Sequence, residues 1–142
     1  MFKFFFIVIA VVWNSFDSQD NKCSVLSKGT FKLYENNIEV GVIYRDNGFQ
    51  IEAYQDASNY TIAKYVYKGE CRYYLKAYEE KELIDTITWK VTYKQKGKNN
   101  FTFEGEPAFQ NSSGYLYKGK LVKVSDSIND KKISKIILFL QK

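Results

Sequence analysis

The chain has 142 residues and a formal net charge of +5, with 21 basic and 16 acidic side chains. This length fits one domain of ordinary size. Because there is no histidine, the commonest general base and most zinc ligands are missing. Two cysteines are too few for a cysteine-rich metal cluster. We therefore expect no catalytic residues, no metal site and no cofactor, and we do not expect an enzyme.

The N-terminus predicts a cleaved secretory signal peptide. Lys3 is followed by an unbroken apolar run from Phe4 to Trp13, and polar residues come next. This run is too short to cross a bilayer as a helix, which needs about 20 residues. We expect residues 1–18 to be removed and residues 19–142 to form a single β domain. The mature chain is then periplasmic or extracellular, without a transmembrane span.

Alternating apolar and polar residues predict about eight β-strands. In residues 86–94, Ile87, Trp89, Val91 and Tyr93 face one way while threonines and lysines face the other. Twelve tyrosines suit such strands, because the ring packs on the sheet while the hydroxyl stays in water. In chain order, the expected strands are residues 29–34, 41–46, 49–54, 60–67, 71–78, 86–94, 100–106 and 115–124.

Tight turns separate these strands. The expected turns carry the residue types that turns require: Glu35-Asn36-Asn37, Asn47-Gly48, Lys68-Gly69, residues 97–100 and residues 111–114. Residues 77–85, AYEEKELID, are interpreted as a strand end followed by a polar loop. Many short strands joined by tight turns predict an all-β fold, an antiparallel meander that forms a small barrel, a half-barrel or a sandwich.

The C-terminal segment fits two structures. Ile133, Ile136, Ile137 and Leu140 lie at helical spacing, and Asp130 stands where it could cap a helix. The unbroken apolar run in residues 131–142, with its β-branched residues, fits a closing strand equally well. We favour the strand.

The hairpin IYRDNGFQIE, residues 43–52, carries the candidate polar site. A two-residue type I′ turn at Asn47-Gly48 places Arg45 opposite Gln50 and within diagonal reach of Glu52. Val42, Tyr44, Ile51 and Ala53 then form the apolar face, and the polar trio lies on a solvated face. A three-residue turn would instead shift the register and bring Arg45 nearer the core. We interpret Arg45, Gln50 and Glu52 as a partly buried structural network, with a ligand clamp as the alternative.

Cys23 and Cys71 are predicted to form a disulfide, because export makes the bond available and no other cysteine is present. Closing this loop contributes about 4 kcal/mol in the chain-entropy model. The lysine clusters in residues 94–100, 118–123 and 131–135 are expected to be solvated strand edges and turns. We expect no specific nucleic-acid binding.

Residues 19–78 resemble a group of short exported bacterial proteins of unknown function, often labelled DNA topoisomerase IV. The resemblance rests on a pattern of cysteine, glycine-aromatic strand, Ile-x-Arg hairpin, Gln-x-Glu and a second cysteine before an aromatic strand. The matching residues are Cys23, Gly29, Phe31, Ile43, Arg45, Gln50, Glu52, Val66, Cys71, Tyr73 and Leu75. The label looks mistransferred, because a chain of this size has no room for a multidomain ATPase. The resemblance implies export and a shared fold.

Two functions remain open. The residues GTFKLY, 29–34, resemble the first strand of lipocalin-like barrels, and a barrel of eight strands has room for side chains or one small ligand. We favour an exported, non-enzymatic, monomeric binding module of the cell envelope or exterior. Its partner would be a small apolar ligand in a cavity lined by Tyr73, Trp89, Tyr93 and Phe103, or an envelope protein. The alternative is a structural or protein-interaction module with a filled core.

Overall fold

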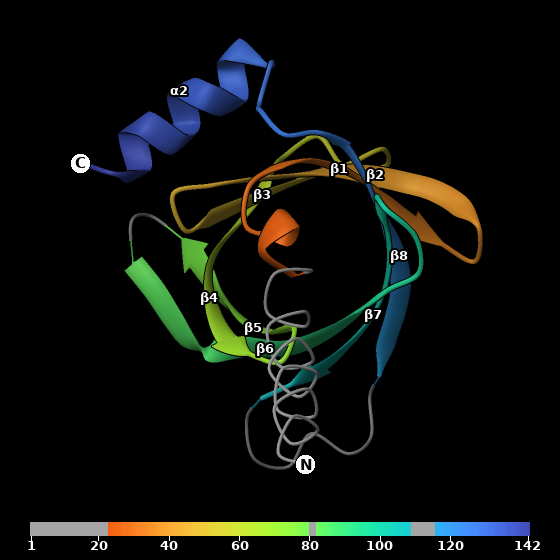
Figure 1. The fold of residues 1–142 in the computed structure, drawn as a ribbon. Coiled ribbons are helices and arrows are strands. Elements are labelled where there is room, and N and C mark those ends of the chain that lie inside the picture. The colour runs from red at the N-terminus through yellow and green to blue at the C-terminus, as the bar shows by residue number, and fades with distance from the viewer. Residues whose placement is uncertain (1–22, 80–81, 109–115) are drawn as a thin grey trace, which may run out of the picture.

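Eight antiparallel strands follow one another around a closed barrel in the computed structural model, which describes residues 23–79, 82–108 and 116–142 (Figure 1). The expected signal peptide, residues 1–18, and the expected turn at residues 111–114 lie outside the described residues. A 3₁₀ turn precedes the barrel and a helix follows it. The elements are η1 Ser24–Leu26, β1 Gly29–Glu35, β2 Ile38–Asp46, β3 Phe49–Tyr54, β4 Thr61–Gly69, β5 Arg72–Glu79, β6 Glu82–Gln95, β7 Asn100–Pro107, β8 Tyr117–Ser125 and α2 Lys131–Leu140.

The first and last strands close the barrel. β1 pairs antiparallel with β8, from Thr30 opposite Ser125 to Tyr34 opposite Lys120. Gly29 begins β1 with a φ of 132°, and a Cβ there would lie 2.3 Å from the carbonyl oxygen of Ser125. Only glycine allows the two strands to meet this closely. The predicted all-β meander is confirmed as a closed barrel, and the sandwich is excluded.

The predicted hairpin turns have the backbone that they require. Asn36 and Asn37 have φ values of 50° and 63°, and Asn47 and Gly48 have values of 52° and 83°. Two consecutive positive φ values are the mark of type I′ turns, which match the twist of the flanking strands. The segment 77–85 differs from the prediction, because β5 runs to Glu79 and β6 already begins at Glu82. The residues from Glu82 to Asp85 therefore belong to a strand, and the expected polar loop was wrong.

The C-terminal segment is helix α2, so our preference for a strand was wrong. The side chain of Asp130 accepts hydrogen bonds from the backbone N–H groups of Lys132 and Ile133, at 2.9 and 3.1 Å, and caps the helix. Ile133 and Ile137 are buried against Ile51 on the outer face of β3. Because β1 and β8 already pair, the closed barrel offers no free edge to a ninth strand. The apolar residues are therefore buried along one face of a helix.

This packing predicts a stability difference between neighbouring residues of α2. Ile137 is 3% exposed and Leu138 is 61% exposed. Ile137→Ala should lower the free energy of unfolding by about 2–4 kcal/mol, because it leaves a cavity against β3. Leu138→Ala, the matched control, should change it by less than about 0.5 kcal/mol. Urea unfolding of both variants measures the difference, and equal effects would show that α2 does not pack on β3 through this face.

Candidate functional site

The N-terminal segment 23–27 seals one end of the barrel, where β1 begins and β2 ends (Figure 1). Cys23 and Leu26 are fully buried inside it. Barrel side chains bind its backbone carbonyls: Tyr73 donates to Cys23 at 3.1 Å, Lys123 to Val25 at 2.7 Å, Arg45 to Leu26 at 2.9 Å, and Tyr65 to Ser27. The carbonyls of the buried residues Cys23 and Leu26 need such partners. Side chains of the barrel thus fix this segment in place.

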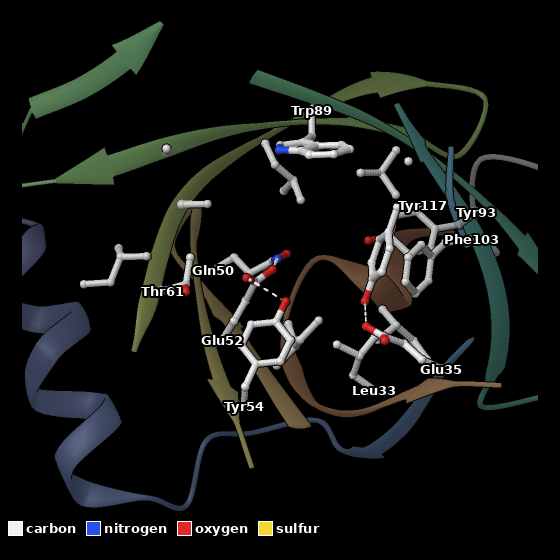
Figure 2. A pocket seen from close by; sticks show the side chains of 18 of the residues that line it. Leu33, Glu35, Gln50, Glu52, Tyr54, Thr61, Trp89, Tyr93, Phe103 and Tyr117 are labelled. Atoms are coloured by element: carbon white, nitrogen blue, oxygen red, sulfur yellow. Dashed lines mark hydrogen bonds between the residues drawn. The ribbon is translucent and has the colours of Figure 1, made fainter. Parts of the chain in front are cut away.

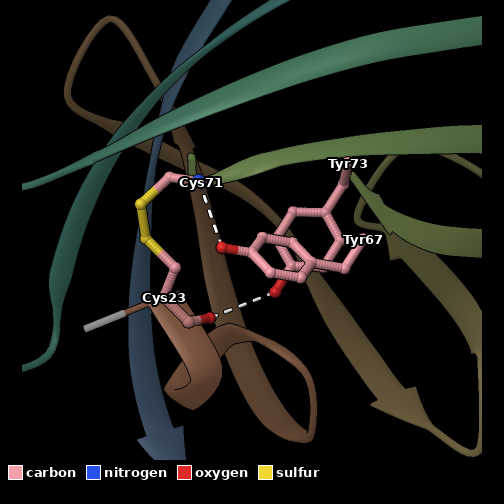
Figure 3. Close-up of a disulfide and its surroundings, with 4 residues drawn as sticks. All are labelled: Cys23, Tyr67, Cys71 and Tyr73. Atoms are coloured by element: carbon pink, nitrogen blue, oxygen red, sulfur yellow. Dashed lines mark hydrogen bonds between the residues drawn. A yellow bond between two sulfur atoms is a disulfide. The ribbon is translucent and has the colours of Figure 1, made fainter. Parts of the chain in front are cut away.

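A disulfide joins the sealing segment to the start of β5. Cys23 and Cys71 are bonded, with their Cα atoms 5.4 Å apart. Figure 3 shows two tyrosines beside the bond: the Tyr73 hydroxyl donates to the Cys23 carbonyl, and the Tyr67 hydroxyl accepts from the Cys71 N–H at 3.5 Å. Burial raises the pKa of Tyr73 to about 12, so it remains a hydrogen-bond donor at neutral pH.

Arg45 is the centre of the sealed end. Its side chain is fully buried. Nε donates to Gln50 Oε1 at 2.7 Å, one terminal nitrogen donates to the Leu26 carbonyl, and the other donates to the Tyr93 hydroxyl. Four aromatic rings surround the guanidinium, with centroids 5.2 to 5.7 Å from Cζ: Phe31, Tyr65, Tyr73 and Tyr93. A buried cation is stable only with this many partners.

The two-residue turn register is confirmed, but the two faces of the hairpin were assigned the wrong way round. Arg45 lies opposite Gln50 and Ile43 lies opposite Glu52, as the type I′ turn requires. Arg45 and Gln50 nevertheless point into the barrel, and both are buried. Ile51 points outward and is buried because α2 covers it. Apolar residues on both faces of the hairpin made the outer face resemble the core.

A cavity of about 690 Å³ occupies the rest of the barrel interior (Figure 2). It extends toward the end opposite the sealing segment, where β1, β3 and β7 end and β4 and β8 begin, since Glu35, Tyr54, Thr61, Pro107 and Tyr117 line it there. The lining is mainly apolar and aromatic. A cavity of this size lies in the range of about 300–1,000 Å³ that holds small ligands. The described side chains therefore leave space inside the barrel.

Three of the four expected lining residues do line the cavity: Trp89, Tyr93 and Phe103. Tyr73 does not, because its hydroxyl binds the sealing segment and its ring packs near Arg45. Within the polar trio, Gln50 and Glu52 line the cavity, whereas Arg45 lies in the sealed layer. The trio therefore links the sealed end to the cavity.

Sequence reasoning missed Glu35, Tyr54 and Tyr117, which also line the cavity. The alternation of inward and outward side chains along a strand could have identified Glu35 and Tyr117. Glu35 continues the inward series of Phe31 and Leu33, and we had interpreted it as part of a turn. Tyr117 begins the inward series that runs through Gly119 to Leu121 in β8.

Two carboxyl groups face the cavity, each bound by a tyrosine hydroxyl. Tyr54 donates to Glu52 Oε2 at 3.1 Å, and Gln50 Nε2 donates to Glu52 Oε1 at 2.8 Å. Tyr117 donates to Glu35 Oε1. Burial raises the pKa of the Glu52 carboxyl above its ordinary value of 4.5, although both hydrogen bonds and the charge of Arg45 act against this rise.

No family of known proteins matches the chain, and no curated protein matches it. Within the described ranges, no three residues of the metal-binding types gather in a cluster. No helix in those ranges is both long enough and apolar enough to cross a membrane. The candidate functional site is therefore the cavity with its two carboxyl groups.

Removing the buried cation should destabilise the fold. Arg45→Ala leaves the Leu26 carbonyl, Gln50 Oε1 and the Tyr93 hydroxyl without their donor, so it should lower the free energy of unfolding by about 3–5 kcal/mol. The matched control is Arg72→Ala, because the Arg72 side chain is 40% exposed and pairs with Glu70 at the surface. This change should cost less than about 1 kcal/mol. Denaturant unfolding measures both variants. An Arg45→Ala variant as stable as the wild type would show that the Arg45 hydrogen bonds do not stabilise the fold.

The raised pKa of Glu52 predicts a pH dependence. The folded state takes up this proton more readily than the unfolded state does. The stability gained is therefore fully present below pH 4.5 and is lost as the pH rises through the folded pKa. The difference in unfolding free energy between the wild type and Glu52→Gln should fall as the pH is raised from 4.5 to neutrality. Glu106→Gln, at an exposed carboxyl, is the matched control. Parallel curves for both variants would contradict the assignment.

Proposed function

We propose that the protein is an exported, non-enzymatic binding module that holds one small, largely apolar ligand inside its barrel. The observation that carries this proposal is the cavity of about 690 Å³ with aromatic walls. Burial of apolar ligand surface against these walls supplies the binding free energy. The periplasm or the cell exterior is the proposed location.

The architecture supports this proposal in two ways. The sealing segment is fixed by the disulfide and by hydrogen bonds to four carbonyls, so the interior needs little reorganisation to accept a ligand. The disulfide also agrees with an oxidising compartment. The resemblance to exported bacterial proteins adds support for export and none for a particular ligand.

A neutral fluorescent dye tests the proposal. Nile red should bind with one saturable site and a rise in emission, because the cavity removes it from water. Ala63 lines the cavity from β4, so Ala63→Trp should fill part of the space and weaken dye binding by about tenfold or more. Lys64, its neighbour, is exposed on the outer face, and Lys64→Trp is the matched control that should leave binding unchanged.

Circular dichroism and unfolding curves show whether each variant is folded. Absence of saturable dye binding to the wild type would refute the proposal. Equal binding by Ala63→Trp and the wild type would place the dye outside the barrel, and the proposal would then lose its main support.

A further inference from the structure

The charged side chains that line the cavity are all acidic within the part of the chain that the structure describes. Among the described residues that line it, Glu35 and Glu52 carry carboxyl groups, and none is a lysine or an arginine. Basic residues outnumber acidic ones in the whole chain, 21 to 16. The described lining of the cavity therefore has the opposite charge preference to the chain as a whole.

The two carboxyl groups come from different strands and lie in one chamber. Figure 2 shows Glu52 with Tyr54 on one side of the cavity and Glu35 with Tyr117 on the other. The pKa of Tyr54 is raised mainly by burial, and the charges of Glu52, Tyr117 and Glu35 all add to this rise. Both carboxylates line the same cavity (Figure 2), so a charged ligand group between them would interact electrostatically with both.

The charges inside the barrel do not balance when both carboxyl groups are ionised. Arg45 supplies one positive charge and is linked to Glu52 through Gln50, which bonds to both. The other largely buried cation among the described residues, Lys123, is already paired with Asp126 at 2.8 Å. Glu35 is bound by the Tyr117 hydroxyl, a neutral donor. One negative charge is left over in a largely apolar chamber, where an uncompensated charge is costly.

We propose that the ligand is a protonated amine with an apolar body, whose ammonium group lies between Glu35 and Glu52. This inference rests on the proposed function and specifies its ligand class. An ammonium group offers up to three N–H donors, and an ionised carboxylate has about four acceptor positions, of which the described donors fill one at Glu35 and two at Glu52. The rings of Trp89 and Phe103 then pack on the apolar body. A carboxylate or phosphate ligand would instead be repelled.

A matched series of eight-carbon compounds tests the charge. Octylamine, octanol and octanoate share one chain and differ only in the head group, and each can be measured by displacement of Nile red. Octylamine should bind at least about tenfold more tightly than octanol, because its hydrogen bonds to carboxylates are charge-assisted. Octanoate should bind most weakly.

Removing either negative charge should reduce the preference for the amine. In Glu52→Gln and in Glu35→Gln, the ratio of octylamine to octanol affinity should fall about threefold or more, and in the double variant it should approach one. Circular dichroism and denaturant unfolding show whether each variant is folded. Glu106→Gln is the matched control. Glu106 lies in β7 between the lining residues Gly105 and Pro107, but it is exposed and pairs with Lys90 at 3.6 Å.

The outcomes separate the two proposals. If Nile red and octanol bind while octylamine shows no advantage, the binding function stands and the amine assignment is wrong. An amine preference that persists in the double variant would also overturn the assignment, because the carboxylates would not be its cause. If no compound binds the wild type, the binding function fails and the amine assignment fails with it.

Discussion

A buried positive charge constrains the whole barrel. The guanidinium of Arg45 is withdrawn from water, so its donors and its charge need partners inside the protein. Those partners come from the sealing segment, from β3 and from β6: the Leu26 carbonyl, Gln50 and the Tyr93 hydroxyl. The surrounding rings exclude water and face the cation. Loss of any one partner would leave a charged or polar group unsatisfied, so these elements must all be in place together.

Arg45 lies between two different parts of the barrel interior. On one side, the disulfide and the bound carbonyls make the end of the barrel solid. On the other side, Gln50 accepts a hydrogen bond from Arg45 and donates one to Glu52, whose carboxyl group faces the cavity. The polar trio is therefore a hydrogen-bonded network that runs from the sealed end of the barrel to the cavity wall.

Local sequence pattern predicted the strands and turns because each depends on neighbouring residues. The alternation in residues 86–94 and the Asn47-Gly48 turn need no information from the rest of the chain. The faces of the hairpin could not be predicted, since Ile51 is buried by α2, which is distant in sequence. The meeting of Glu35 with Tyr117 likewise depends on the register between β1 and β8, which only barrel closure sets. The tail was ambiguous because its spacing fits both structures, and the absence of a free edge decided between them.

The position of the disulfide affects how the protein would respond to a protease. A single backbone cut anywhere between Cys23 and Cys71 leaves both fragments covalently joined, because the cross-link spans the first four strands. A cut beyond Cys71 leaves the C-terminal fragment attached only by hydrogen bonds and packing. The turns between β1 and β5 can therefore be nicked without releasing a strand. A cut anywhere between Cys71 and β8 has no such protection, because the strand that closes the barrel is then held without a covalent link.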